Sequence, residues 1–391
     1  MEQNRRLLSL DVMRGITISG MILVNNPGSW SHIYTPLEHA QWNGMTPTDL
    51  VFPFFMFVMG ISMYFSLKKY DFKPSKGVLW KILRRTILIF VVGIAIGWFS
   101  ILCSNVFNIG SDKPLLERFQ HGIFPFERIR ILGVLQRLAL VYGFGALIVV
   151  FVRHRYVLWI SGAILLVYTF ILWFGNGFDL SADNVINIVD RSLLGVHHMY
   201  KETLPDGTII PFDPEGLLST LPGIAHVLLG FYVGMMISKT KENNARLQSI
   251  FIFGTILLFT GLLLSYGIPL NKKVWSPTFV LVTCGFGSLL FALLLWIIDV
   301  KGAKKWSVFF ESFGVNPLFV YVLADFFAIL LGDIRFYNGS EVVSLQGYFY
   351  HNALLPFFVP EFASLIYALL FVMLIWVFAH FLYKKKIYIK I

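Results

Sequence analysis

The densest group of polar and ionisable side chains in the sequence follows the first apolar segment. It includes Asn25, His39, Asn43 and Asp49, with Trp42 among them. An imidazole titrates near neutrality, so His39 could take a proton from a reacting group, and a carboxylate such as Asp49 could fix the tautomer of its ring. The alternative is an ordinary solvated loop, in which Trp42 anchors the chain at the interface and Asp49 caps the next helix. The residue types alone leave both interpretations open.

Two further groups of polar residues stand inside apolar segments, where an unpaired charge is costly. Asp11 and Arg14 are three residues apart, so they share a helical face and are expected to form an internal ion pair. Gln136 and Arg137 lie about six residues into another apolar segment, roughly 9 Å along a helix. Arg137 therefore needs an anionic partner, a route to the surface or a ligand.

Asn316 precedes Pro317 in a third apolar segment. Proline removes a backbone donor and clashes with the preceding turn, so the helix is expected to break at this position. Irregular backbone at membrane depth is tolerated where it lines a cavity or is buried in protein. The pair therefore predicts a break that lines a cavity.

Membrane-spanning helices must position these residues. The chain has 391 residues, of which 57% are hydrophobic and 14% charged, whereas soluble domains have about 45–50% and about 25%. The apolar residues come in blocks long enough to cross about 30 Å of hydrocarbon. This pattern excludes a water-soluble enzyme, a nucleic-acid-binding protein and a disordered chain. The Lys and Arg residues that give the net charge of +10 lie mainly in the loops between these blocks, as the topology of a membrane protein requires.

The predicted fold class is all-α, a polytopic membrane protein with about ten transmembrane helices in a single domain over residues 1–391. The apolar windows fall at residues 8–26, 50–67, 86–107, 131–152, 156–175, 217–237, 247–267, 276–298, 308–332 and 361–383. The segment 341–358 is too polar and broken to span alone, and we expect it to lie in the interface or to re-enter. Eleven transmembrane helices are the alternative to ten.

Both termini are predicted to face the cytoplasm. Lys and Arg are more than twice as frequent in the loops on the N-terminal side of the membrane as in the loops on the other side, which is the pattern of cytoplasmic loops. Arg5 and Arg6 precede the first window, and no small-residue cleavage site follows it. This window is therefore interpreted as a retained span rather than a signal peptide.

No metal site or disulfide framework is predicted. Cys103 and Cys284 lie in or at the end of apolar blocks and show no ligand spacing. His197 and His198 are adjacent, so they do not have the four-residue spacing that places two ligands on one helical face.

Motifs between residue 9 and about residue 320 make the sequence similar to a known family. They are Ser9-Leu-Asp-Val-Met-Arg-Gly15, Leu23-Val-Asn25, His39-Ala-Gln-Trp-Asn-Gly44, Thr46-Pro-Thr-Asp-Leu-Val-Phe-Pro-Phe-Phe55, Gly133-Val-Leu-Gln-Arg-Leu138, Phe212-Asp-Pro-Glu-Gly216, Asn271-Lys-Lys-Val-Trp-Ser276 and Gly314-Val-Asn316. The sequence resembles the transmembrane acetyltransferases typified by lysosomal heparan-alpha-glucosaminide N-acetyltransferase, with their bacterial DUF5009 or NagX-like relatives.

The resemblance implies an acetyl-CoA-dependent transmembrane acetyltransferase. In this reaction, acetyl passes from cytoplasmic acetyl-CoA to the amino group of glucosamine, or of a glucosamine-terminated saccharide, on the other side. The resemblance also implies that His39 is the catalytic histidine and that Asn25 is the matching asparagine, and Asp49 is expected to orient the ring. We place around the substrate or CoA cavity a further set of residues: Trp42, Asn43, Gln136, Arg137, Asp213, Glu215 and Asn316.

The donor contacts are less defined. Lys81, Arg84 and Arg85 lie on the cytoplasmic side of the predicted topology and could attract the phosphates of CoA. The positive charge of cytoplasmic loops explains the same residues without a ligand.

Several alternatives stay open. His39 acts either as a base in a ternary complex or as an acetylated carrier, and a shared cavity favours direct transfer. An amino-sugar transporter and an O-acetyltransferase of cell-envelope polysaccharide are the competing functions. The predicted partners are acetyl-CoA, the amino sugar and the lipid bilayer, without nucleic acid or metal, and a homodimer is left open. The expected location is a bacterial cytoplasmic membrane.

Overall fold

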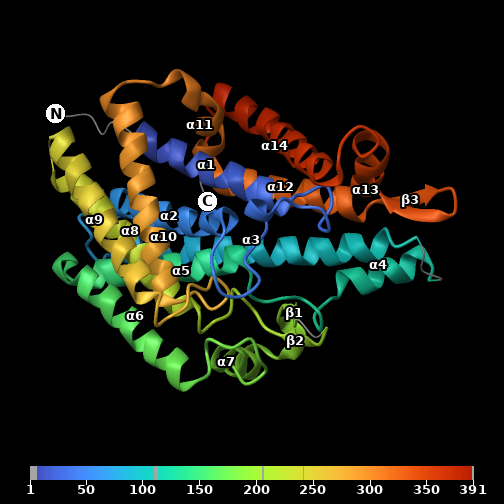
Figure 1. Ribbon diagram of the computed structural model, residues 1–391, viewed down its shortest axis with the longest axis horizontal. Helices are drawn as coiled ribbons and strands as arrows, with labels where there is room; N and C mark the ends of the chain where they lie inside the picture. The colour runs from blue at the N-terminus through green and yellow to red at the C-terminus, as the bar shows by residue number, and fades with distance from the viewer. Residues whose placement is uncertain (1–6, 110–112, 205–206, 241, 390–391) are drawn as a thin grey trace.

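The structure is a computed structural model that describes residues 7–109, 113–204, 207–240 and 242–389. Long helices dominate it (Figure 1). They are α1 (Leu8–Asn25), α2 (Val51–Lys68), α3 (Lys76–Val106), α5 (Val134–Phe151), α6 (Val157–Phe174), α8 (Thr220–Lys239), α9 (Asn243–Leu264), α10 (Pro277–Leu294), α11 (Val308–Val315), α12 (Pro317–Asp333) and α14 (Pro360–Lys384).

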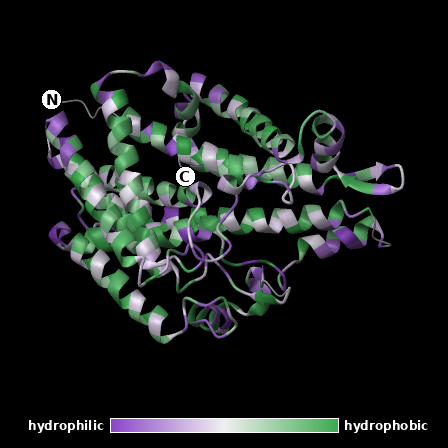
Figure 2. Ribbon diagram, in the orientation of Figure 1, coloured by the Kyte–Doolittle hydropathy of each residue, from purple (hydrophilic) through white to green (hydrophobic). Residues whose placement is uncertain are grey.

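The helix lengths confirm the predicted polytopic membrane protein. Within the described ranges, nine helices are long and apolar enough to cross a membrane, and the bent pair α11–α12 raises the number to ten. These helices are apolar along most of their length, and polar residues gather at their ends (Figure 2). The chain is therefore an integral multi-pass membrane protein, as the apolar windows predicted.

One predicted boundary is wrong. The third window was placed at residues 86–107, but α3 begins at Lys76 and has 31 residues. Ser75 caps this helix, because its side chain accepts a hydrogen bond from the backbone of Val78. The basic residues of the first turns lower the mean hydropathy and thereby hide the true start of the helix from a search for apolar residues.

The break predicted at Pro317 is confirmed. Asn316 has non-helical dihedral angles (φ −126°, ψ 55°) between α11 and α12, and the two helices are bent by 77°. Proline begins α12, where its missing donor would have had no intrahelical partner. Asn316 and Pro317 both line a cavity inside the bundle.

The remaining elements are short and lie between the long helices. Residues 341–358 form a strand followed by short helical turns, so this segment adds no further span. The short elements are η1 (Thr35–Leu37), η2 (Pro47–Leu50), α4 (Leu115–Ile123), η3 (His154–Tyr156), α7 (Val185–Leu194), η4 (Val196–His198), η5 (Leu295–Val300), η6 (Lys305–Ser307), α13 (Leu345–Phe349) and η7 (Tyr350–Leu354), with the antiparallel hairpins β1 (Lys201–Thr203)–β2 (Ile209–Pro211) and β3 (Arg335–Asn338)–β4 (Glu341–Ser344).

Small residues allow α2 and α8 to pack closely. A β-carbon added at Gly60 would lie 2.2 Å from the carbonyl oxygen of Val227, and one at Gly230 would lie 2.2 Å from that of Phe57. Close approach of this kind replaces the missing hydrophobic drive between helices in lipid with van der Waals contact. It fixes the position of α2, which begins next to the predicted site.

Several connecting segments meet at one end of the bundle, which we call the His39 end. Hydrogen bonds join the α1–α2 loop to the α6–α7 loop and the α9–α10 loop, and the α4–α5 loop to the α7–α8 connection. Lys68 and Ser238 contact each other at the opposite end, which we call the Lys68 end. Arg5 and Arg6 lie outside the described residues, and the cytoplasmic orientation of the termini stays a prediction.

Candidate active site

His39 lies in the loop between α1 and α2, directly opposite Asp49 on η2. The Nδ1 atom of His39 is 2.6 Å from Oδ1 of Asp49. The Asp49 side chain is only 1% exposed, whereas the His39 side chain is 43% exposed. The structure thus joins the two residues that the sequence paired. The carboxylate is buried beneath the ring, and the ring itself stays accessible.

The local backbone explains why Asp49 holds this position. Its Oδ2 atom accepts hydrogen bonds from the backbone amides of Ala40 and Thr46, both at 3.1 Å, and from Oγ1 of Thr46 at 3.2 Å. Asp49 therefore closes the first turn of η2 with one oxygen and contacts His39 with the other. The capping role and the functional role that the sequence left as alternatives occur together.

Lys272 is the third member of this group, and its role was not predicted from the sequence. We call His39, Asp49 and Lys272 the His39 group. The Nζ atom of Lys272 is 3.1 Å from Nδ1 of His39 and 3.3 Å from Oδ1 of Asp49. Burial lowers the pKa of Lys272, and the negative charges of Asp49 and Glu215 partly oppose that effect. The only signal in the sequence was the position of Lys272 inside a family motif, because its side chain otherwise resembles an ordinary loop cation.

Two contacts fix the turn that carries Lys272. The backbone amide of Gly44 donates to the carbonyl of Leu270 at 2.7 Å, and the side chain of Asn271 donates to Oδ1 of Asn43 at 3.2 Å. Gly44 has a φ of +106°, a conformation that favours glycine. Asn43, predicted as a binding residue, therefore joins the two loops that form the site.

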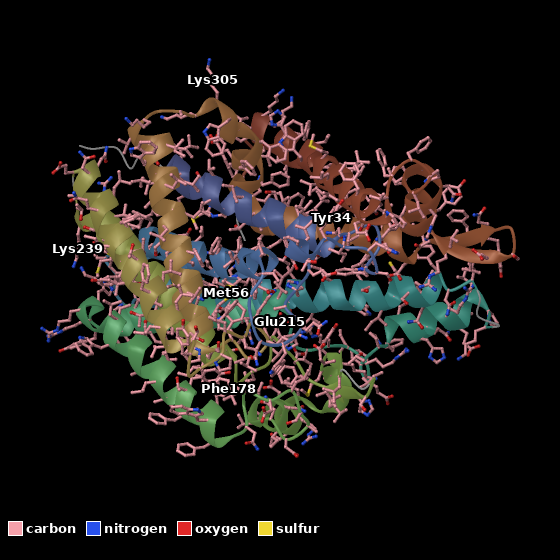
Figure 3. The ribbon with its side chains drawn as sticks, viewed as in Figure 1. Tyr34, Met56, Phe178, Glu215, Lys239 and Lys305 are labelled. Carbon is pink, nitrogen blue, oxygen red and sulfur yellow. The ribbon has the colours of Figure 1, made fainter. Side chains whose placement is uncertain are left out.

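Trp42, which was also predicted to bind a ligand, contacts other residues of the chain. Its indole nitrogen donates to the carbonyl of Phe178 at 2.7 Å, and its ring meets that of Phe212 edge to face, with centroids 5.5 Å apart. This arrangement is a favourable one for two aromatic rings. Trp42 thus connects the His39 loop to the segments on either side of α7, and Figure 3 labels Phe178 in this region.

Asp213 and Glu215 are bound by Arg130, a residue the sequence analysis treated only as a loop cation. Arg130 donates to both oxygens of Asp213, at 2.6 and 3.0 Å, and to Glu215 at 2.6 Å. Burial alone would lower the pKa of Arg130, but the charges of Glu215 and Asp213 raise it. Glu215 lies near the middle of the molecule in Figure 3, away from Lys239 and Lys305. The contacts of Arg130 with these two carboxylates hold the loop before α8 in place.

Arg137 is fully buried on α5 and binds the same loop. Its Nη2 atom donates to the carbonyl of Gly216 at 3.0 Å and to the hydroxyl of Ser219. The guanidinium carbon lies 5.3 Å from the centre of the Trp275 ring. Nε and Nη1 have no hydrogen-bond partner among the described residues. The neighbouring Gln136 packs against Gly93 of α3 and is 4% exposed.

Asn25 and Asn316 also lie apart from the His39 group. Asn25 is exposed at the end of α1, and its side chain forms no hydrogen bond with another described residue. Asn316 bonds the C-terminal segment instead: it donates to the carbonyl of Ile387 and accepts from the amide of Ile389, both at 2.8 Å. Asn316 therefore belongs to a second place in the bundle.

That second place is a cavity of about 300 Å³. Its walls come from α1, α2, α3, α5, the α11–α12 break and the C-terminal segment, with the lining residues Arg14, Phe55, Met59, Ser62, Ser66, Arg85, Ile89, Leu138, Asn316, Pro317, Leu318 and Ile389. Arg14 bonds Asp11 at 3.1 Å, which confirms the predicted ion pair, and it also donates to Ser62 at 2.8 Å. Of the three cations considered for CoA phosphates, Arg85 is the one that lines this cavity.

The cavity and the His39 group share helix α2. Asp49 lies in the turn that leads into α2, and Phe55 is six residues further along, which corresponds to about 9 Å of helical rise. Ser62 and Ser66 continue the cavity wall toward the Lys68 end.

The sequence is similar to two curated proteins. It is 27% identical over 370 residues to heparan-alpha-glucosaminide N-acetyltransferase of Mus musculus, covering 81% of this chain and 53% of that protein. It is 28% identical over 371 residues to the protein of the same name from Homo sapiens, covering 81% of this chain and 52% of that protein. The chain spans about half the length of the curated relatives it matches. No family model matches the chain. The similarity to these proteins confirms the resemblance to the transmembrane acetyltransferase family that the motifs predicted.

Proposed function

We propose that the chain is an acetyl-CoA-dependent transmembrane acetyltransferase. In this proposal the acceptor is the amino group of glucosamine or of a glucosamine-terminated saccharide. The observation that carries the proposal is the His39–Asp49 pair, with 2.6 Å between Nδ1 and Oδ1 on an accessible imidazole. The similarity to N-acetyltransferases over most of the chain supports the choice of reaction.

The geometry suits His39 as a general base. When Nδ1–H donates to Asp49, the lone pair of the imidazole is on Nε2. A protonated amine has no free pair to attack a thioester, so the acceptor must lose a proton first. The amine attacks in its neutral form, after losing one proton to solvent, and Nε2 takes the second proton as the amine nitrogen forms a bond to the acetyl carbonyl carbon. The carbon–sulfur bond then breaks, and the imidazolium returns a proton to the thiolate of CoA.

The cavity beside α2 suits the donor. Arg14 and Arg85 line it, and guanidinium groups bind phosphate oxygens through charge-assisted hydrogen bonds. The predicted topology places its Lys68 end at the cytoplasm, where acetyl-CoA is found. The thioester would enter from there and extend along α2 toward His39, and the saccharide would bind from the other side.

Mass spectrometry of the reaction products tests the proposal. The purified protein receives acetyl-CoA and a panel of amino sugars, and we expect N-acetylated glucosamine products. His39→Ala should abolish turnover, and His32→Ala is the matched control, because His32 is a partly buried histidine of the same loop that contacts Ser29. Full activity of His39→Ala in a folded protein would remove His39 from the catalytic role.

Two further measurements separate the alternatives. Proteoliposomes that accumulate unmodified glucosamine without acetyl-CoA would indicate a transporter, and acetylation of hydroxyl groups alone would indicate an O-acetyltransferase. Incubation with acetyl-CoA alone distinguishes the two mechanisms, since an acetyl group trapped on His39 would contradict direct transfer. We favour direct transfer, because two substrates held together react with a high effective concentration.

A further inference from the structure

Lys272 is the one member of the His39 group to which the proposed reaction assigns no role. It reaches the group from the α9–α10 loop, 233 residues away in sequence from His39. Its side chain is 20% exposed, and two contacts between the loops hold its turn in place. A lysine held in this way has lost much of the side-chain freedom of a surface lysine, so its position requires an explanation.

The geometry limits what Lys272 can do to the ring. A carboxylate can only accept, so the 2.6 Å contact with Asp49 requires the proton on Nδ1 of His39, which then has no lone pair in the ring plane for Lys272. The 3.1 Å contact between Nζ and Nδ1 is therefore electrostatic in effect. A carboxylate next to an imidazole favours the charged imidazolium, whereas an adjacent ammonium opposes it. Asp49 and Lys272 act on His39 in opposite directions.

We propose that Lys272 is a positioning residue that keeps His39 neutral, while Asp49 holds the tautomer of the ring. Asp49 without a nearby cation would favour the imidazolium form of His39, and an imidazolium cannot accept a proton from an amine. With Lys272 in place, Asp49 and Lys272 together carry no net charge, and Nε2 keeps its lone pair. This inference rests on the proposed function for the catalytic importance of His39.

The other charged groups near Lys272 are accounted for. Glu215 faces it from the loop before α8, and the adjacent Lys273 lies on the same turn. Glu215 is paired with Arg130 at 2.6 Å, and Lys273 is paired with Glu202 at 2.9 Å. Asp49 is therefore the carboxylate whose negative charge Lys272 neutralises, and His39 is the titratable group next to both charges.

The experiment measures the protonation of His39 without any turnover. Diethyl pyrocarbonate modifies neutral imidazole, and mass spectrometry of the peptide that contains His39 gives the extent of modification at each pH. We compare the wild-type protein with Lys272→Met, Lys272→Gln and Lys272→Arg. Lys273→Met is the matched control, because both lysines are 20% exposed and ion-paired.

We expect the neutral Lys272 variants to move the midpoint of His39 modification upward by about one to two pH units. Lys272→Arg should restore the wild-type midpoint, and Lys273→Met should change it little. The acid limb of the pH profile of kcat/KM should move with the midpoint, and the rate at low pH should fall about tenfold for every pH unit by which the midpoint rises. The use of two neutral substitutions covers the case in which one of them fails to fold.

The outcomes separate the inference from the proposed function. An unchanged midpoint in folded Lys272→Met and Lys272→Gln would overturn the role of Lys272, whatever the activity of the protein. A wild-type protein that transfers no acetyl group would overturn the proposed function, and the midpoint would still report whether Lys272 controls the charge of His39. A midpoint that moves equally in Lys273→Met would also contradict the inference, because the effect would then be one of general surface charge.

Discussion

Asparagine in place of Asp49 is the sharpest test of how the site holds its histidine. The substitution keeps the size and shape of the side chain and removes only its charge and one acceptor. Asp49 accepts from His39 and Lys272 through Oδ1, and through Oδ2 from two backbone amides and the hydroxyl of Thr46. The amide oxygen of asparagine should occupy the Oδ2 position, because three donors face it there.

The amide nitrogen of the new side chain then faces His39. An NH₂ group cannot accept the proton on Nδ1, so the ring should change to the tautomer with the proton on Nε2 and Nδ1 as the acceptor. That tautomer has no lone pair on the atom that must take the proton from the amine. Loss of a positioned base, or of its correct tautomer, costs about 10²- to 10⁴-fold in kcat. We therefore expect a loss in this range, which equals about 3–5 kcal/mol in the barrier.

The assay follows release of free CoA thiol with glucosamine as acceptor, over a range of pH values. Thr48→Val is the matched control, because Thr48 is about as buried as Asp49 and, within the described part of the chain, its hydroxyl hydrogen-bonds only the carbonyl of Pro36. We expect Thr48→Val to retain most of the activity. If Asp49→Asn keeps kcat within tenfold of the wild-type value while His39→Ala is inactive, the reasoning from the tautomer is wrong.

Two further predictions concern stability. Arg130→Met leaves the buried carboxylate of Asp213 and the partly buried carboxylate of Glu215 without their cation, so the free energy of unfolding should fall by about 3 kcal/mol. Thermal melting in detergent measures this, and the Arg128→Met substitution at an exposed position is the control. Burial raises the pKa of Asp190 to about 6, so its carboxylate destabilises the fold above that pH by up to about 3 kcal/mol, and the cost disappears as the pH falls toward 4. Asp190→Asn should therefore raise the melting temperature at pH 8 and change it little at pH 4.5, and equal melting curves at pH 8 would refute this.

Much of the fold was predictable because the evidence for it is local. A run of apolar residues identifies a membrane-spanning helix wherever its neighbours lie, so the ten windows correspond to the nine candidate helices and the bent pair α11–α12 within the described residues. The Asp11–Arg14 pair and the break at Pro317 also depend on residues within one turn of helix. His39 and Asp49 are also close in sequence, because only ten residues separate them.

The unpredicted parts of the site depend on contacts between loops. Lys272 and His39 are 233 residues apart, and Arg130 and Asp213 are 83 residues apart. The rule that assigns Lys and Arg to loops on either side of the membrane treats them as equivalent charges. It cannot distinguish a cation that faces solvent from one that is turned inward to a carboxylate. The hydrogen-bond partners of Asn316 also lie far along the chain, because they are the backbone groups of Ile387 and Ile389 in the C-terminal segment.

The packing of α2 determines how the proposed transfer must proceed. Gly60 of α2 and Gly230 of α8 leave no room for a β-carbon at their crossing, so α2 has little freedom to slide along its neighbour. Asp49 and the cavity-lining Phe55 therefore keep a separation of about 9 Å along this helix. His39 is bound to Asp49 and cannot travel that distance without losing the contact that fixes its tautomer. In the proposed reaction the acetyl thioester must consequently extend out of the cavity to the imidazole.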